Sequence, residues 1–509
     1  MTKSSEKTVI EPRDPGSTAK LFRNMHRPAL LNHQDEWLEW TGAAYAAIDD
    51  LTIQSEVRKF LEASFVKVVI ENRGEVSISY APFCPSRKDV AEVYDALKDD
   101  FHVPPETMMP PCWLEDREKL YAGLDPRNLI SCKNGLLDMS TRELYPATPK
   151  FFTRTSLDIE FAPEAPPPKR FLSFLNEVAA ERQPLIDLLQ EMTGYIVSGD
   201  TSLQKVFFFR GKRRAGKGTI LRILEELIGK RNIATPTIRN LPSQFGMQSL
   251  IGKPLAAISD MNCDNAPALS EAGSVINGIS GEDTQTIPRK FHTDWIGKVG
   301  ARFLLISNRM PNFGTNTDAL AARLLIVPFD VSFEGREDFE LDIKLRAELP
   351  GILNWALDGL DRLKARGRFV EPDDSKVAKR NLLYQSNPVH GFVAECCKVG
   401  PGTETDKDVL YEAFSQFCRQ SGFNSTKVLP KFSQDLQDLF DVTVRRRTAD
   451  DGRQPGVFVG IRLNDELLPE FFAVNRDLIE LGFEAHEALK LDKRGWPMAR
   501  VDGGADFEL

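Results

Sequence analysis

The chain has 509 residues, which is too long for one compact domain and suits about two to four. Hydrophobic residues make up 41% and charged residues 27%, a composition that excludes a mostly disordered chain. The formal net charge of −9, from 65 Lys and Arg against 74 Asp and Glu, argues against a protein that coats nucleic acid with its whole surface. It leaves room for local basic sites.

The seven cysteines form no CxxC pair, and no two histidines have zinc-ligand spacing, so we expect free thiols in a reducing compartment. The first residues are polar and lack the apolar core of a signal peptide. No stretch approaches the ~20 apolar residues that span a bilayer. These features predict a soluble cytoplasmic protein without a membrane partner.

In chain order, residues 1–20 are polar and predict a disordered N-terminus. Residues 21–161 mix aromatic-rich strands with helical patterns, including a helix over SEVRKFLEASFVKVV (55–69), and predict a mixed α/β region. The proline-rich segment APEAPPPKR opens a linker and helical region over 162–202.

Residues 203–387 change to short apolar strands separated by helices and polar loops. The predicted strands are LQKVFFF, PLAAISD, ARFLLIS and RLLIVPF. Strands that alternate with helices indicate an α/β layer with a mainly parallel sheet. The segment after them is expected to be helical, carried by GILNWALDGLDRLKAR.

The strongest motif is FFFRGKRRAGKGT, in which an apolar strand precedes a glycine loop and a helix follows it. Such a loop surrounds phosphate oxygens with backbone N–H groups, a lysine adds positive charge, and a hydroxyl binds Mg²⁺. The expected ATP-binding residues are Gly211, Arg213, Arg214, Ala215, Gly216, Lys217, Gly218 and Thr219. Gly218 takes the place directly after the lysine, so Thr219 is the candidate metal-side hydroxyl.

Three polar residues lie at the ends of the predicted strands that follow. Asp260 ends PLAAISD, where a carboxylate could hold Mg²⁺, or could simply cap a turn. Asn308 ends ARFLLIS, where an amide could position the attacking water, or could begin an Asn-containing turn. Arg323 precedes RLLIVPF and could reach a neighbouring subunit's phosphate, or could form a surface ion pair.

Between Asp260 and Asn308 lies INGISGEDTQTIPRKFHTDW, which predicts a hairpin that carries a basic cluster. Arg289, Lys290 and His292 surround Phe291 there and could contact nucleic-acid phosphates. A solvated basic hairpin is the alternative.

Residues 388–463 predict a winged-helix-like domain, with helices followed by the strands VTVRRR and GVFVGIRL. Arg445, Arg446 and Arg447 on the first of these strands, with Arg453 in the loop, could contact duplex phosphates. Pairing with neighbouring acids is the alternative. Residues 464–509 are expected to form an acidic tail.

The order GKRRAGKGT, AISD, ISGEDTQTIPRKF, LLISNRMPNF and ALAARLLIVPF resembles the A, B, B′, C and arginine-finger motifs of superfamily-3 helicases. The chain is most similar to the helicase part of phage, plasmid and poxvirus-type primase–helicases. The resemblance implies an AAA+-type P-loop core in a homo-hexameric ring, with ATP at subunit interfaces and single-stranded DNA in the central channel.

The resemblance also implies a role for each candidate residue. Gly211, Gly216, Lys217 and Thr219 would bind ATP and Mg²⁺, Asp260 would be the B-motif acid, Asn308 the sensor, Arg323 the finger acting in trans, and Lys290 with Arg289 and His292 the DNA-contacting hairpin. This sequence departs from the family pattern at two positions. Gly218 follows the lysine where Ser or Thr is usual, and Asp260 is a single acid where many relatives have a Glu or an acid pair.

Together these features predict an ATP-dependent DNA helicase of a phage, prophage or plasmid replicon, acting on single-stranded and forked DNA in a bacterial host's cytoplasm. Residues 1–130 lack an Asp-x-Asp pair and a Cys/His zinc quartet, so we expect a helicase without a primase, the priming function being lost or supplied by a separate primase. Asp406 and Asp408 have that spacing but are expected to begin a helix. Two alternatives stay open: an origin-binding protein gated by nucleotide that does not unwind DNA, and a P-loop nucleotide kinase.

Overall fold

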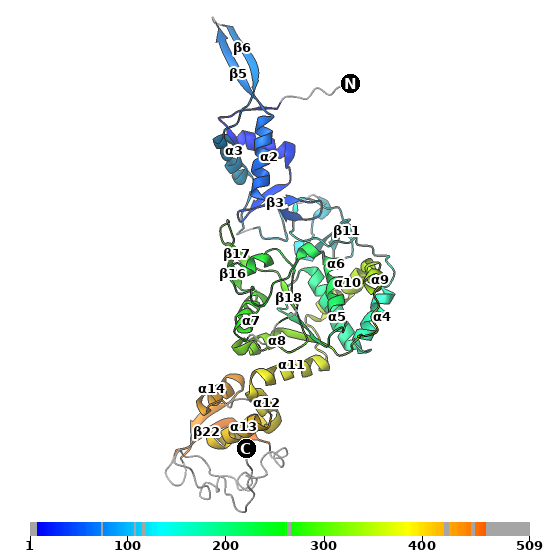
Figure 1. Cartoon of the computed structure of the whole chain (residues 1–509), viewed down its shortest axis with the longest axis vertical. Coiled ribbons are helices and arrows are strands. Elements are labelled where there is room, and N and C mark those ends of the chain that lie inside the picture. Colours follow the sequence, from blue (N-terminus) through cyan, green and yellow to red (C-terminus); the bar gives the residue numbers. More distant parts are fainter. Residues whose placement is uncertain are drawn as a thin grey trace, which may run out of the picture. The chain divides into compact units, whose positions relative to one another are not determined.

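The computed structural model describes residues 8–72, 75–105, 108–114, 119–259, 261, 266–421, 427–448 and 454–464. The chain divides into two compact units, residues 1–378 and 379–509, which we describe separately (Figure 1). The division falls inside helix α11 (Asp373–Ser386), a helix that the sequence assigned to the end of the 203–387 core.

A five-stranded parallel sheet forms the centre of the first unit. Its strands, in spatial order, are β14 (Ile233–Ala234), β15 (Leu255–Ile258), β18 (Arg302–Ser307), β13 (Val206–Gly211) and β19 (Leu324–Phe329). All four strands predicted for this region are present, so the predicted α/β layer with a parallel sheet is confirmed. Because the strands are parallel, the loops that follow β13, β15 and β18 meet at one edge of the sheet.

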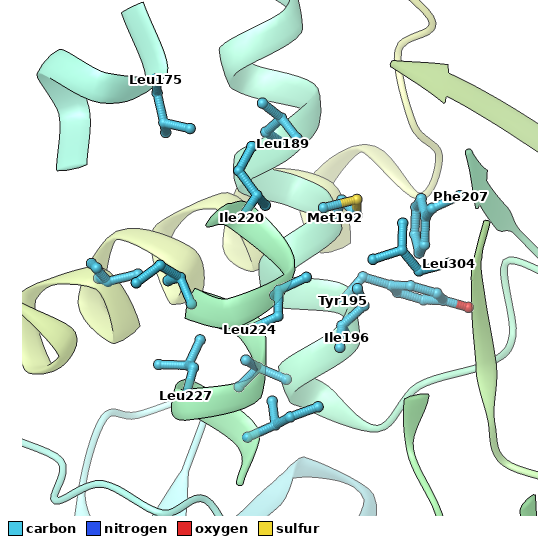
Figure 2. Close-up of a cluster of buried hydrophobic side chains, with 14 of the residues drawn as sticks. Leu175, Leu189, Met192, Tyr195, Ile196, Phe207, Ile220, Leu224, Leu227 and Leu304 are labelled. Carbon is cyan, nitrogen blue, oxygen red and sulfur yellow. The ribbon is translucent and has the colours of Figure 1, made fainter. Parts of the chain in front are cut away.

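Helices surround this sheet. They are α4 (Lys169–Val178), α5 (Gln183–Ser198), α6 (Lys217–Ile228), α7 (Ala266–Ser280), α8 (Thr317–Arg323), α9 (Leu341–Arg346) and α10 (Leu349–Arg366). Figure 2 shows α5 and α6 packed together through Leu189, Ile220 and Leu224, beside Phe207 of β13. Burying these apolar faces fixes α6 beneath the glycine loop. None of the helices in the described ranges is both long and apolar enough to cross a membrane.

The N-terminal part of the first unit is a small mixed α/β assembly, as predicted. It contains β1 (Val9–Ile10), α1 (Pro15–His26), β2 (Leu30–His33), β3 (Glu36–Trp40), β4 (Tyr45–Ala47), α2 (Asp50–Glu62), β5 (Phe65–Asn72), β6 (Glu75–Pro82), α3 (Arg87–Asp100) and β7 (His102–Val103).

Two predictions for this part were wrong. The expected disorder over 1–20 does not hold for the described residues, because α1 begins at Pro15 under an Asp14 side chain that accepts a hydrogen bond from the backbone of Ser17. The helix expected over 55–69 ends at Glu62. The residues after it form β5, which pairs with β6, because β-branched side chains pack well on a pleated strand.

Short strands connect this part to the central sheet. They are β8 (Cys112–Trp113), β9 (Leu129–Cys132), β10 (Gly135–Asp138), β11 (Leu144–Tyr145) and β12 (Phe151–Phe152), and β10 pairs with β11 in an antiparallel hairpin. Short 3₁₀ turns span Lys119–Tyr121, Pro126–Asn128, Lys230–Asn232, Gly246–Leu250 and Gly314–Asn316. The predicted basic hairpin is also present, as β16 (Thr284–Ile287) and β17 (Trp295–Lys298).

The second unit packs three helices on an antiparallel sheet of order β20-β22-β21. Its elements are α12 (Pro388–Cys396), β20 (Cys397–Asp406), α13 (Lys407–Gln420), α14 (Leu429–Leu439), β21 (Thr443–Arg446) and β22 (Gly456–Leu463). Strand β20 was not predicted, because KVGPGTETD contains glycines and a proline that do not favour a strand. Asp406 caps α13 by accepting from the Asp408 backbone, as the sequence indicated.

Candidate functional site: the glycine loop and its cavity

The glycine loop joins β13 to α6, and two of its glycines cannot be replaced without a clash. A Cβ atom at Gly211 would lie 2.0 Å from the carbonyl oxygen of Phe329 on β19. Gly216 has φ +89°, and its Cβ would lie 2.8 Å from Val178 on α4. The loop therefore needs glycine for close approach at one end and for left-handed backbone at the other.

Lys217 is buried beneath this loop, with 8% of its surface exposed. Its Nζ donates to the carbonyl oxygens of Gly211 at 2.8 Å and Lys212 at 2.5 Å, and to Oδ1 of Asn308 at 3.0 Å. The ammonium thus joins the loop after β13 to the end of the adjacent strand β18. Lys217 and Asn308, predicted from separate motifs, are brought into direct contact.

A cavity of about 890 Å³ opens over the loop, a size in the range of small-molecule sites. Seven of the eight predicted ATP-binding residues line it, Gly211 being the exception, together with Ser259 and Asn308. The remaining lining residues are Arg170, Phe174, Glu177, Leu221, Arg222, Ile306, Phe333, Arg336, Glu337, Asp338, Phe339, Leu341 and Asp342. Apolar rings and six cationic side chains thus share one cavity, as a nucleotide's base and phosphates would require.

Several of those arginines are held by acids from residues 337–342, which the sequence reading did not single out. Arg214 pairs with Glu337, and Arg222 donates to both carboxylate oxygens of Asp342 at 2.8 and 3.2 Å. Arg222 lies three residues after Thr219 on α6, so helical periodicity could have placed it beside the loop. The acids follow β19 in a segment that contains no recognisable motif, so the sequence did not predict their place beside the loop.

The Thr219 hydroxyl faces this cavity and accepts a hydrogen bond from Arg222 at 3.1 Å. A hydroxyl beside a phosphate cradle is a hard oxygen ligand of the kind that Mg²⁺ prefers, so the residues present fit that ion. Asp260, the second predicted metal ligand, lies outside the described residues; Ser259 directly before it lines the cavity. Within the described ranges no cluster of three or more His, Cys, Asp or Glu could hold a metal by itself.

Arg323 lies at the opposite edge of the sheet from the glycine loop. It directly precedes β19, whose first residue Leu324 pairs with Val206, the first residue of β13. The six residues of β13 separate that edge from Gly211 by about 17 Å. The Arg323 guanidinium donates to the Asn277 carbonyl oxygen, to Asn277 Oδ1 at 2.8 Å and to Ser280 at 3.2 Å, all at the end of α7.

The predicted DNA-contacting residues of the β16–β17 hairpin differ in exposure. Phe291 at the tip is fully exposed, and Lys290 is exposed with its Nζ 5.5 Å from the ring centre of Phe245. Arg289 is buried, and burial lowers the pKa of its guanidinium. His292 is half-buried, with Nδ1 3.0 Å from the Asp35 carbonyl oxygen.

Of the predicted arginines of the second unit, Arg445 and Arg446 lie on an exposed strand, β21, and Arg447 directly follows it rather than lying on it. Arg445 pairs with Glu404 of β20, and Arg447 lies 3.8 Å from the same carboxylate. These two arginines therefore have the acidic neighbour that the alternative expected, while Arg446 is exposed on the strand and its contact with DNA stays a prediction. Arg453 lies outside the described residues.

Three protein-family models match successive segments of the chain. Residues 19–179 match a model described as D5 N terminal like, residues 209–323 match a family of unknown function (DUF5906), and residues 384–469 match a model described as poxvirus D5 protein-like. The middle segment runs from the strand before the glycine loop to Arg323. The chain is thus similar to D5-type proteins on both sides of the glycine-loop core, with each model covering less than half of it.

Solved structures give weaker likenesses. The apo A form of the NrS-1 C-terminal region is 12% identical over 88% of this chain and all of that one, with a TM-score of 0.46. A second apo structure of that region is 11% identical over the same shares, also at 0.46. A JCV helicase bound to a thiazolopyridine compound is 12% identical over 42% of this chain and 71% of that one, with a TM-score of 0.25. TM-scores below 0.5 do not establish a shared fold.

Proposed function

We propose that the chain is an ATP-dependent DNA helicase of a phage, prophage or plasmid replicon, with an AAA+-type core that acts as a hexameric ring. The contact between Lys217 and Asn308 carries this proposal. It joins the phosphate loop to a polar residue on the neighbouring strand, at the edge where a γ-phosphate and its attacking water would lie. The D5-type matches on both sides of this core support a replication role.

In this proposal ATP phosphates enter the cavity over the loop, and the Lys217 ammonium exchanges its carbonyl partners for phosphate oxygens. That exchange is favourable because a phosphate oxygen adds a negative charge that a carbonyl oxygen lacks, so both partners of the hydrogen bond are then ionised. Asn308 then orients the water that attacks the γ-phosphate. Mg²⁺, when bound, would neutralise phosphate charge, held by Thr219 and the acid Asp260.

The position of Arg323 supports action in trans. Arg323 directly precedes β19, at the end of the sheet that lies a strand length of about 17 Å from Gly211 of its own chain. At that separation it is poorly placed to stabilise charge developing on its own chain's nucleotide. In the proposed ring, the end of the sheet that carries Arg323 would face the cavity of the next subunit. Arg323 would then leave Asn277 and Ser280 and contact the neighbour's γ-phosphate.

DNA would be contacted at two places. The exposed Lys290 and Phe291 at the hairpin tip offer a charge and a stacking ring to single-stranded DNA. In the second unit, the order of helices α12, α13 and α14 with three antiparallel strands supports a winged helix, with Arg446 exposed on its first wing strand.

Two assays test the proposal. ATP hydrolysis stimulated several-fold by single-stranded DNA, together with strand displacement on a forked duplex, is the expected result. DNA binding without displacement would instead favour a nucleotide-gated origin-binding protein. Phosphate transfer to a nucleoside monophosphate, with no response to DNA, would favour a nucleotide kinase.

A further inference from the structure

A two-residue turn in the N-terminal part has an unusual backbone. Strands β2 and β3 pair up to His33 and Glu36, which leaves Gln34 and Asp35 as the whole turn. Their φ angles are +52° and +59°, the left-handed values of a type I′ turn, for which Asn-Gly is the favoured sequence. Neither residue is the one that this backbone prefers, so contacts outside the turn must offset its local strain.

The turn contacts the tip of the β16–β17 hairpin, more than 250 residues away. Arg289 donates to the Gln34 carbonyl oxygen at 2.5 Å, and His292 Nδ1 lies 3.0 Å from the Asp35 carbonyl oxygen. The Gln34 side-chain amide bonds to both the N–H and the carbonyl oxygen of Ile296, each at 3.2 Å. Gln34 therefore pairs with the outer edge of β17 as a short extra strand would.

Asp35 is itself held in place from the N-terminal part. Lys98 of α3 donates to its carboxylate at 3.1 Å, and His292 lies 3.8 Å from the same group. The hairpin is thus held by the side chains of Gln34 and Asp35 as well as by their backbone carbonyl oxygens.

Arg289 is a buried cation whose hydrogen bonds go to neutral acceptors, while the carboxylates of Glu36 and Asp35 lie near enough to favour its charge. Its Nε donates to the Thr293 carbonyl oxygen at 2.8 Å, and its Nη2 donates to the Gln34 carbonyl oxygen. A phosphate oxygen is a stronger acceptor, because both partners then carry charge. Nucleic acid that reaches the hairpin tip would therefore withdraw Arg289 from the turn.

We propose that the Gln34–Asp35 turn is an autoinhibitory latch, which holds the hairpin tip and competes with single-stranded DNA for Arg289 and His292. This inference rests on the proposed function, in which the hairpin contacts DNA. Lys290 and Phe291 point outside the latch and remain exposed, so they make the first contact. DNA binding then requires the latch to open. The apparent affinity is therefore the affinity of the open form multiplied by the fraction of molecules in which the latch is open.

The test is a variant that keeps the turn but weakens the latch. Gln34→Asn with Asp35→Gly gives the preferred type I′ sequence while removing the side-chain bonds to Ile296, Lys98 and His292. We expect single-stranded DNA to bind the full chain about fivefold more tightly, the equivalent of losing roughly one net hydrogen bond from the competing state. Fluorescence anisotropy over a salt series measures this.

The salt dependence separates a latch from a general change in charge. Because the lost contacts are to the turn and not to DNA, the plot of log affinity against log salt should shift upward without changing slope. Arg289→Gln should lower that slope by about 0.7, the value for one phosphate contact on a single strand. In the Arg289→Gln background the turn variant should lose most of its effect.

A matched control replaces another pair of left-handed residues, Ala180→Asn with Glu181→Gly, in the connection between α4 and α5. It should leave DNA affinity unchanged. If Lys290→Gln weakens DNA binding but the turn variant binds DNA with unchanged affinity, the latch is refuted and the DNA-contacting hairpin stands. If neither Lys290→Gln nor Arg289→Gln alters affinity or slope, the hairpin is not a DNA site. That result would refute both the latch and the proposed contact between the hairpin and DNA.

Discussion

The Nζ atom of Lys217 lies 3.0 Å from Oδ1 of Asn308, so the phosphate-loop ammonium is held by the end of the adjacent strand. The same ammonium donates to the carbonyl oxygens of Gly211 and Lys212, beneath an open cavity. Such a site favours an incoming anion that can replace them. Its geometry leads to two expectations about catalysis.

Asn308→Ala should lower ATP turnover by about 10²-fold, because it removes a group that positions the attacking water, while ATP affinity stays nearly unchanged. Lys217→Ala should abolish both binding and turnover. Steady-state hydrolysis and a fluorescent-nucleotide titration measure the two quantities. Asn176→Ala, an exposed asparagine on α4, is the matched control and should behave as the wild type. Equal losses of affinity and turnover in Asn308→Ala would assign it to ground-state binding.

Mixing two inactive variants tests the trans role of Arg323. Lys217→Ala and Arg323→Ala should each stop turnover, and the second should still bind ATP. Mixed and allowed to reassemble, they should regain activity, because about a quarter of randomly formed interfaces would join an intact Lys217 to an intact Arg323. If the mixture stays inactive although the subunits exchange, Arg323 does not complete a neighbour's site.

The two glycines of the loop on either side of Lys217 should differ in their tolerance of alanine. Gly216→Ala places a Cβ at φ +89° and 2.8 Å from Val178, so it should destabilise the fold by about 1–3 kcal/mol or more. Gly218→Ala meets only an Arg222 nitrogen at 3.4 Å on a helix, where alanine is favoured by up to about 1 kcal/mol. Thermal unfolding compares them. Equal melting temperatures would show that the backbone of Gly216 is unstrained.

Acid should destabilise the N-terminal part through His33, which precedes the latch turn. Burial, and secondly the charge of Arg154, lowers the pKa of His33 from 6.5 to about 4. A lowered folded-state pKa means that the unfolded chain binds the extra proton between pH 6.5 and 4. His33 should therefore cost stability as pH falls through that window, at about 1.4 kcal/mol per pH unit. His33→Gln should flatten the slope measured by chemical denaturation; an unchanged slope would assign the effect to other groups.

Part of the site followed from chain order alone. The glycine spacing, the strand before it and the helix after it predicted the loop with Lys217 at its helix start, because each depends on local backbone geometry. The alternation of apolar strands and helices likewise predicted the parallel sheet. These features depend only on residues that are contiguous in the chain.

Other features depended on contacts between distant residues. Arg170 and Arg222 enter the cavity, and Glu337 and Asp342 hold two of its arginines, through packing that no local pattern encodes. Strand β5 replaced an expected helix because pairing with β6 outweighed the helical pattern that continued from α2.

The sequence by itself determined the phosphate-loop chemistry and the order of polar residues at strand ends. Only the tertiary structure decided that Lys217 meets Asn308, that Arg323 lies at the far edge of the sheet, and that Arg289 is buried against the Gln34 turn. The reason is physical: spacing along a chain fixes what one loop or helix can present. Which residues from other segments meet it depends on strand order and side-chain packing.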